Sequence, residues 1–330
     1  MPLPPGHPSP ESAAHRTALP DHPRDTDMHI HVLGAGAGGG FPQWNCNCAN
    51  CAGYRAGTLR TTARTQSSIA VSADGTDWIL FNASPDIRAQ LAAFAPMQPN
   101  RGIRDTGICA VLLIDSQIDH ATGLLMLREH TRRLPVYLSA PAQQDLSTGL
   151  PLLKVLEHYC GTEVHELPLD GAAFTIPGAA GLVIRTVALA SKAPPYSPHR
   201  HDPHPGDNVG VFIEDTRSGG RLFYAPGLGE IEDHLLPYLE QADLLLVDGT
   251  FWTEDEMIRH GIVHKFAREM GHLPQSGEDG MIRALAPYRG RKVLIHINNT
   301  NPILVEDGPE RAELAAHGIE VAYDGMDFEL

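Results

Sequence analysis

The sequence predicts an α/β layered domain, on the strength of three observations. From Met28 onward, short runs rich in β-branched and apolar residues alternate with segments of helical periodicity. Several of the strand-like runs are apolar throughout, which is typical of sheets that are covered on both faces. The chain has 330 residues and is 42% hydrophobic, which is enough to fill a core and excludes a disordered chain. Strands with helices between them indicate layers of sheet and helix.

The predicted elements follow one another along the chain in a regular order, and no internal repeat is visible. The strand-like runs lie at 29–33, 67–73, 78–82, 108–114, 182–188, 209–214, 221–225, 243–248 and 292–297. The helical segments lie at 86–94, 121–133, 141–147, 231–240, 276–286 and 309–317.

Residues 1–27 are rich in proline and polar residues and lack the apolar stretch of a secretory signal, so we expect a disordered N-terminal extension. Residues 28–330 are expected to form a single domain, with Met28 a candidate start. No run approaches the ~18 apolar residues of a membrane span, and without an export signal the expected location is the cytoplasm. The formal net charge of -15 disfavours nucleic acids and membrane surfaces as partners, because both are anionic.

A cysteine cluster is the first candidate metal site. Cys46, Cys48 and Cys51 fall within six residues of a chain that has five cysteines in all. Three thiolates this close can face one ion, and a soft tetrahedral site suits a structural zinc. The fourth ligand stays unassigned. Cys109 lies in an apolar run and is expected in the core, whereas Cys160 receives no role.

A glycine-rich run follows the first predicted strand. Gly34, Gly36 and Gly39 match the G-x-G-x-x-G pattern of dinucleotide-binding proteins. The residues after the run do not begin a helix, and no acidic residue lies at the expected offset of about 20. The favoured interpretation is therefore a tight backbone turn at a crowded place, with no dinucleotide cofactor.

Polar residues cluster at the junction between the predicted strand 108–114 and the predicted helix 121–133. Asp119 and His120 are adjacent there, and such a pair can supply an oxygen and an imidazole to one metal ion. The alternative is that Asp119 caps the helix, and the sequence alone leaves both interpretations open.

Three further positions fit the same pattern. Asp248 and His296 each close an apolar run, and His272 lies in the segment EMGHLP. Polar residues at several strand ends favour a shared site, while structural histidines remain the alternative.

The longest irregular segment, 190–208, has five prolines and three histidines, His199, His201 and His204. Its H-x-H spacing could bind a metal, but the favoured interpretation is a solvated lid.

Several motifs resemble a known superfamily. DSQIDH at 115–120 resembles the H-x-H-x-D-H signature of the metallo-β-lactamase superfamily, with Asp115 and Gln117 at the places of the first two histidines. The glycine-rich turn before C-x-C-x-x-C resembles the phosphodiesterase branch, whose cysteines hold a structural zinc. Nine segments in order resemble the family of pyrroloquinoline quinone (PQQ) biosynthesis proteins within that superfamily: GGGFPQWNCNCANC, TQSSIAVS, NASPDI, DSQIDHATGLL, APPYSP, FYAPGLGE, DGTFW, EMGHLP and LIHINNTNPIL.

The resemblance implies a metallo-β-lactamase-like αββα sandwich with its active site at one edge. Asp119, His120 and His296 would be metal ligands, and Asp115 could still coordinate. His272 would act as a catalytic histidine, with Asp248 orienting a ligand.

The resemblance also implies which metals to expect. The superfamily's mid-chain histidine is replaced near Ser191 and its bridging aspartate is not evident, so the edge site favours one iron over two zincs. At the place of the branch's fourth zinc ligand stands Asn299.

The function that the resemblance implies is PQQ biosynthesis. The reaction would be an iron- and O2-dependent hydroxylation of the tyrosine ring in a small, peptide-derived, cross-linked Glu–Tyr precursor. Arg64 and Arg128 could pair with the precursor's carboxylates, and a homodimer is allowed. Two alternatives stay open: a non-enzymatic carrier of PQQ or its precursor, and a metallo-hydrolase of the phosphodiesterase kind.

Overall fold

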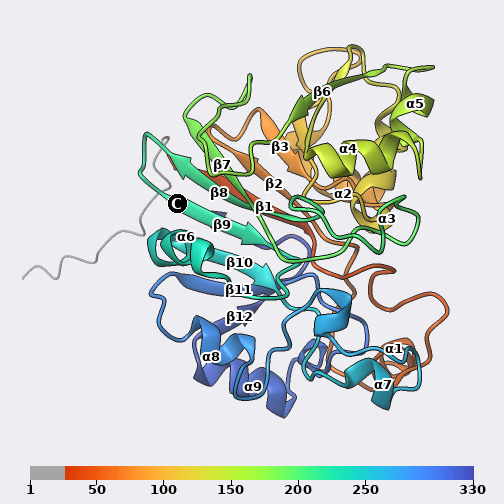
Figure 1. Ribbon diagram of the computed structural model, residues 1–330, viewed down its shortest axis with the longest axis vertical. Helices are drawn as coiled ribbons and strands as arrows, with labels where there is room; N and C mark the ends of the chain where they lie inside the picture. Colours follow the sequence, from red (N-terminus) through yellow and green to blue (C-terminus); the bar gives the residue numbers. More distant parts are fainter. Residues whose placement is uncertain (1–26) are drawn as a thin grey trace, which may run out of the picture.

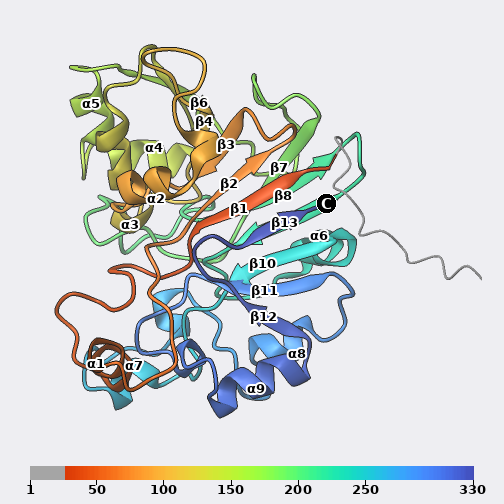
Figure 2. The same ribbon diagram turned by 180° about the vertical axis from the view of Figure 1, so that it is seen from behind.

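The computed structural model describes residues 27–330, which form two β-sheets packed face to face with helices on both outer sides (Figures 1 and 2). The expected αββα sandwich is confirmed. The predicted N-terminal extension, apart from Asp27, lies outside the described residues.

The first sheet combines antiparallel and parallel pairing. Its order is β13 (Asp327–Glu329), β1 (His29–Gly34), β2 (Ser68–Ser72), β3 (Trp78–Phe81), β4 (Ile108–Leu112), β5 (Leu134–Leu138) and β6 (Thr162–Glu166). The pairs from β13 to β3 are antiparallel, and those from β3 to β6 are parallel.

The second sheet repeats this pattern. Its order is β12 (Ile319–Val321), β11 (Arg291–Ile295), β10 (Leu244–Asp248), β9 (Arg221–Ala225), β8 (Val209–Asp215) and β7 (Leu182–Ala188). The pairs from β7 to β9 are antiparallel, and those from β9 to β12 are parallel. The two halves therefore share a topology that the sequence does not display as a repeat.

The main core lies between the sheets. Ile69 and Phe81 of the first sheet and Tyr224 and Leu246 of the second belong to one cluster of fully buried side chains. Inward-facing apolar residues on alternate strand positions build this layer, and the outward-facing ones build two further layers under the helices.

The helices cover the two outer faces. On the first sheet lie α2 (Ile87–Ala93), α3 (Ile118–Ala121), α4 (Ala140–Ser147) and α5 (Leu152–Leu156). On the second sheet lie α6 (Leu236–Gln241), α8 (Met281–Leu285) and α9 (Pro309–Ala316). Both views place α1 (Ala49–Ala56) beside α7 (Glu256–Arg259), away from the sheets.

The predicted helix 121–133 is wrong. The structure has the short α3 followed by a 3-10 helix over Thr122–Leu127. The reason is tertiary: the Gly123 amide donates to the Ala83 carbonyl at 2.8 Å, and the Ala83 amide donates to the His120 carbonyl at 2.7 Å. These bonds replace the i→i−4 bonds of a helix and fasten His120 to the loop after β3.

Two other helices are shorter than expected, and three were missed. The predicted helix 276–286 is reduced to α8, because Gly277 has a φ of 99° that a helix does not allow. In 231–240 a 3-10 turn comes first, and Pro237 lies in the first turn of α6. The sequence did not indicate the helices α1, α5 and α7 or the strands β5, β6, β12 and β13. No helix within residues 27–330 is long and apolar enough to cross a membrane.

Candidate functional site

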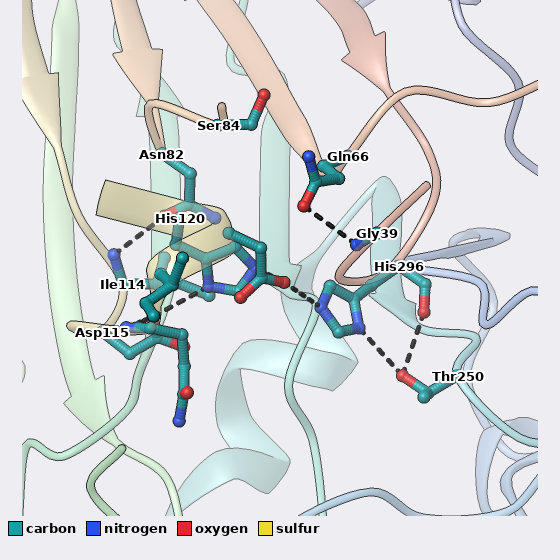
Figure 3. Close-up of polar contacts among 12 residues, drawn as sticks. Gly39, Gln66, Asn82, Ser84, Ile114, Asp115, His120, Thr250 and His296 are labelled. Atoms are coloured by element: carbon teal, nitrogen blue, oxygen red, sulfur yellow. Dashed lines mark hydrogen bonds and ion pairs between the residues drawn. The ribbon is translucent and has the colours of Figure 1, made fainter. Parts of the chain in front are cut away.

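The candidate site lies where parallel strands of both sheets end. The strand β4 is followed by the segment from Asp115 to His120, β10 ends at Asp248, and β11 is followed directly by His296. Because parallel strands of one sheet end at the same edge, the two sheets bring these residues together. Figure 3 shows His120 and His296 facing the same space from opposite sides.

Asp119, His120 and His296 offer ligand atoms that lie within 4.8 Å of one another. The Asp119 Oδ2 atom is 3.6 Å from His120 Nε2 and 3.5 Å from His296 Nε2. Asp119 does not cap the helix: the N-cap of α3 is Gln117. Asp119 instead points its carboxylate toward the two imidazoles.

The donor set fits a metal ion. The His120 Nε2 atom is buried and has no hydrogen-bond partner among residues 27–330. Leaving a buried polar atom without a hydrogen-bond partner costs free energy of folding. Such an atom in a native site therefore indicates that a ligand binds there. One carboxylate and two imidazoles, with one imidazole nitrogen unpartnered, match the donors of a mononuclear metal site.

The charges of the site shift two pKa values. Burial alone would lower the pKa of His120, but the carboxylates of Asp115 and Asp119 outweigh it and raise this pKa to about 9. Burial would raise the pKa of Asp119, but His120 and His296 outweigh it and lower this pKa well below its usual range. The cluster therefore attracts one positive charge, which a proton or a metal ion can supply.

Asp115 lies behind His120 rather than among the grouped donors. Its Oδ1 atom accepts from the Gln117 amide at 2.9 Å and lies 2.8 Å from His120 Nδ1 (Figure 3). This is the ring nitrogen opposite to the one that faces Asp119. The geometry thus gives Asp115 the place of a group that orients the histidine, not that of a ligand.

His272 and Asp248 form a pair next to this cluster. Asp248 is fully buried, and its Oδ2 atom lies 2.6 Å from His272 Nδ1. Burial would lower the pKa of His272, but Asp248 outweighs it and raises this pKa. Together with His296 the pair forms a second group of donors within 4.8 Å.

One expectation about these residues is corrected. His272 does not lie at a strand end; it follows a 3-10 turn over Arg268–Met270, in the loop before α8. The structure also adds Thr250, to which the sequence assigned no role. Its hydroxyl lies among Asp248, His272 and His296, and the signals in sequence were its place two residues after Asp248 and inside the segment DGTFW.

The glycine-rich turn is packed against the site. A Cβ atom on Gly38 would lie 3.2 Å from Asp119 Oδ2, and one on Gly34 would lie 2.2 Å from the Gln66 carbonyl oxygen. The Gly39 amide donates to Gln66 Oε1 at 2.9 Å (Figure 3). These close approaches agree with the interpretation of a tight turn at a crowded place.

The cysteine cluster lies at the start of α1. Cys48 is the N-cap of this helix and Cys51 lies in its first turn, so the three sulfur atoms converge within 4.8 Å. The Asn299 side-chain nitrogen reaches all three, at 3.0 Å from Cys46 Sγ, 3.6 Å from Cys48 Sγ and 3.5 Å from Cys51 Sγ. The side chain of Asn299 therefore fills the fourth side of the cluster.

The remaining cysteines carry no metal-binding geometry within the part of the chain that is described. Cys109 packs partly buried against the main core, as expected, and burial raises its pKa to about 12. Cys160 packs under the first sheet's helices.

The segment 190–208 is docked in part, and only residues 201–205 of it form a continuous exposed run. His199 is buried, with its Nε2 atom 2.8 Å from Asp207 Oδ1 and its ring stacked on His204. The Tyr196 hydroxyl donates to the Ser116 carbonyl, beside Asp115. The expectation of a solvated lid is therefore wrong for His199, whereas His201 and His204 are exposed.

The two arginines suggested as precursor ligands lie elsewhere. Arg64 is buried, and its guanidinium donates to the Ala322 and Thr62 carbonyls. Arg128 lies beside Glu129 and over the ring of Tyr159. They were suggested because of their positive charge alone, and charge does not predict where a side chain lies in the fold.

Comparisons with known proteins identify the family and agree with the fold. The beta-lactamase superfamily domain matches residues 77–297. Coenzyme PQQ synthesis protein B of Methylococcus capsulatus is 64% identical over 304 residues, covering 92% of this chain and 100% of the relative. The protein of the same name from Nitrosococcus oceani is 62% identical over 309 residues, with the same two shares.

Among solved structures, the Zn2+-bound PqqB from Methylobacterium extorquens has a TM-score of 0.83 and 39% identity, covering 92% of this chain and 100% of that one. A diphosphatase of the PhnP family, at 20% identity and a TM-score of 0.63 over 92% of this chain and 97% of that one, shares the fold alone. The chain therefore belongs to the coenzyme PQQ synthesis protein B family, within the beta-lactamase superfamily.

Proposed function

We propose that this protein acts in PQQ synthesis as an iron- and O2-dependent hydroxylase of the tyrosine ring in a cross-linked Glu–Tyr precursor. The observation that carries the proposal is the buried cluster of Asp119, His120 and His296, with the His120 Nε2 atom unpartnered among the described residues. Two imidazoles and one carboxylate are the donors of non-haem Fe(II) oxygenases. The names of the relatives supply the pathway.

Asp119, His120 and His296 would hold Fe(II), which supplies the activation of dioxygen when bound. Asp115 accepts from the Nδ1 side of His120 and so keeps the Nε2 lone pair directed at the site. Gly38 leaves room for the Asp119 carboxylate, since a Cβ atom there would crowd Oδ2.

His272 would hold or move a proton beside the reacting ring. Its Nδ1 atom lies on Asp248 at 2.6 Å, and its ring stacks on that of His296 with centroids 5.4 Å apart. An imidazole whose Nδ1–H is held by a buried carboxylate presents Nε2 as the exchanging atom. This arrangement suits deprotonation of a phenol.

The cysteine cluster would hold a structural zinc. Three thiolates are typical of a structural zinc site, and the Asn299 side-chain nitrogen donates to them without being a ligand itself, so the fourth ligand stays unassigned. Thiolates in this state require a reducing compartment, so we place the protein in the cytoplasm.

A metallo-hydrolase is the second candidate. The two donor groups at the edge share His296, an arrangement that could hold two ions side by side. Against it, Asp248 is already engaged by the Leu228 and Thr250 amides and by His272. One metal at the edge favours the hydroxylase and two favour the hydrolase.

The test is a turnover assay with the cross-linked Glu–Tyr peptide. Anaerobically prepared protein is loaded with Fe(II) and exposed to isotopically labelled dioxygen, and the product is examined by mass spectrometry. We expect the label in the tyrosine ring, and none with His120→Ala. Unlabelled product or equal turnover by His120→Ala would overturn the hydroxylase proposal.

A further inference from the structure

The hydroxyl of Thr250 lies among Asp248, His272 and His296. It contacts the Nδ1 atom of His296, whereas the Nε2 atom of this ring faces the proposed metal. Its Oγ1 atom is 2.6 Å from Asp248 Oδ1, 2.9 Å from His296 Nδ1, 2.9 Å from the His296 carbonyl oxygen and 3.1 Å from His272 Nδ1. Thr250 is 3% exposed, so bulk water does not compete for these bonds. One hydroxyl therefore touches three functional side chains (Figure 3 shows its contacts with His296).

A count of protons fixes the direction of these bonds. A hydroxyl has one hydrogen to donate, and both Asp248 Oδ1 and the His296 carbonyl can only accept. If that hydrogen went to His296 Nδ1 instead, two oxygen atoms would face the Thr250 oxygen at 2.6 Å and 2.9 Å with no hydrogen between them. The hydrogen therefore goes to an oxygen, and His296 Nδ1 must donate to Thr250.

This assignment determines the tautomer of His296. With the hydrogen on Nδ1, the neutral ring presents its lone pair on Nε2, the atom that lies 3.5 Å from Asp119 Oδ2. His120 and His272 follow the same rule, because carboxylates lie on their Nδ1 atoms at 2.8 Å and 2.6 Å. Thr250 thus accepts from the Nδ1 atom of His296, as Asp115 does for His120 and Asp248 does for His272.

The backbone conformation of His296 is unusual, and Thr250 contacts it. His296 has a φ of 61°, in the left-handed region that residues with a Cβ atom rarely adopt. Neighbouring bonds hold this turn: the Gly249 amide donates to the Ile295 carbonyl, and the Ile297 amide donates to the Ala35 carbonyl. The Thr250 hydroxyl lies 2.9 Å from the His296 carbonyl oxygen, so the side chain also contacts the backbone of this turn.

We propose that Thr250 is the positioning residue that holds His296 in the Nδ1–H tautomer and so presents its Nε2 atom to the edge metal. The inference rests on the metal site of the proposed function but not on the hydroxylation itself.

The test measures Co2+ binding to protein whose cysteine cluster keeps its zinc. Thr250→Val removes the hydroxyl at nearly constant shape, and we expect a loss of about 10–100-fold in Co2+ affinity, the range for groups that orient metal ligands. Thr250→Ser restores the hydroxyl and should restore the affinity. Thr216→Val, at an exposed turn hydroxyl, is the matched control and should bind as the parent does.

A spectroscopic readout separates positioning from a general loss of structure. Long-range proton–nitrogen correlation spectra of metal-free, nitrogen-labelled protein should show His296 as the Nδ1–H tautomer in the parent and in Thr250→Ser. His296→Gln assigns its signals. Retained zinc and an unchanged unfolding midpoint identify variants that fold; if Thr250→Val does not fold, the parent spectrum decides.

The outcomes that overturn the inference are distinct from those that overturn the metal site. Parent-like Co2+ affinity in a folded Thr250→Val, or an Nε2–H tautomer of His296 in the parent, overturns the role of Thr250 alone. If the parent and His120→Ala bind Co2+ equally, the proposed metal site at the edge is wrong. The role of Thr250 at that site is then wrong as well.

Discussion

The cysteine cluster and the edge site reach a metal-binding geometry in different ways. Cys46, Cys48 and Cys51 come from one turn and the first turn of α1, and the first two are partly exposed whereas Cys51 is buried. At the edge, Asp119 and His120 come from the first sheet and His296 from the second, and both imidazoles are buried. One site is local in the chain, and the other exists only when the sandwich is closed.

The two sites also differ in what lies behind the ligands. Behind the sulfur atoms lie neutral donors: the Cys48 amide donates to Cys46 Sγ, and the Asn299 side-chain nitrogen reaches all three sulfur atoms. At the edge each imidazole has a dedicated partner on Nδ1: Asp115 for His120, and Thr250 for His296. We therefore expect a metal at the edge site to be more sensitive to the groups that orient its ligands than a metal at the cysteine cluster.

The largest expected effect is on stability, at the cysteine cluster. Cys51→Ala should lose the zinc and lower the free energy of unfolding by about 3 kcal/mol or more, since two thiolates hold zinc poorly. This is less than the roughly 10 kcal/mol of a zinc-finger peptide, because here large apolar cores between and outside the sheets also stabilise the fold. Denaturant unfolding and zinc analysis measure it.

Cys109→Ala is the matched control, because it removes a thiol that packs on the core. It should keep its zinc and lose about 1 kcal/mol. Equal losses in the two variants would show that Cys51 matters for packing and not for a metal.

The next effect concerns the orienting groups. Asp115→Asn removes the charge behind His120 but keeps an acceptor oxygen, so we expect the Co2+ affinity of the edge site to fall about tenfold with little change in stability. Isothermal titration measures the affinity. Asp170→Asn, at an exposed turn, should change nothing. Unchanged affinity in Asp115→Asn would remove the distinction drawn between the two sites.

The pH dependence of the edge site follows from His120. In metal-free protein its pKa is about 9, so below that pH a metal must displace a proton. Co2+ affinity should rise about tenfold per pH unit from 6 to 8, as expected for one released proton. A flat profile would contradict the raised pKa.

The same shift has a consequence for stability. A histidine whose folded pKa is raised above about 6.5 stabilises the metal-free fold fully below pH 6.5 and loses that contribution as the pH rises through about 9. His120→Gln should flatten this part of the stability profile, which thermal unfolding between pH 6 and 9.5 can measure.

The smallest effect is at Glu256. Its side chain contacts Thr300, which follows His296 and Asn299 in the chain. Burial raises the pKa of Glu256 to about 7, although bonds from Thr300 and the Trp252 amide oppose the rise. Its contribution to stability is therefore present below the unfolded pKa of about 4.5 and is lost as the pH rises through about 7. Glu256→Gln should be more stable than the parent at pH 8, by on the order of 1 kcal/mol. A less stable variant at that pH would show that the carboxylate is needed in ionised form.

The sequence predicts the local features well. The strands at 182–188 and 221–225 match β7 and β9 because apolar, β-branched runs between turn residues leave few alternatives. The cysteine spacing finds its cluster for the same reason, since all three ligands lie within one turn and one helix.

Features made by contacts across the fold escape the sequence. The helix expected at 121–133 is broken by bonds between Ala83 and the segment at His120 and Gly123, which no local pattern records. From the sequence, Asp115 is a candidate metal ligand, and only the structure shows that it lies behind His120. Nothing in the sequence assigns a role to Thr250. The strand ends indicated the edge site, but only the closed sandwich separates ligands from the groups that orient them.

The most direct test of the two-site account is the metal content of anaerobically prepared protein, with His120→Ala and Cys48→Ala beside it. We expect one iron and one zinc in the parent, loss of iron alone in His120→Ala, and loss of zinc alone in Cys48→Ala. A parent without iron under any preparation, together with a His120→Ala variant of the same metal content, would contradict it.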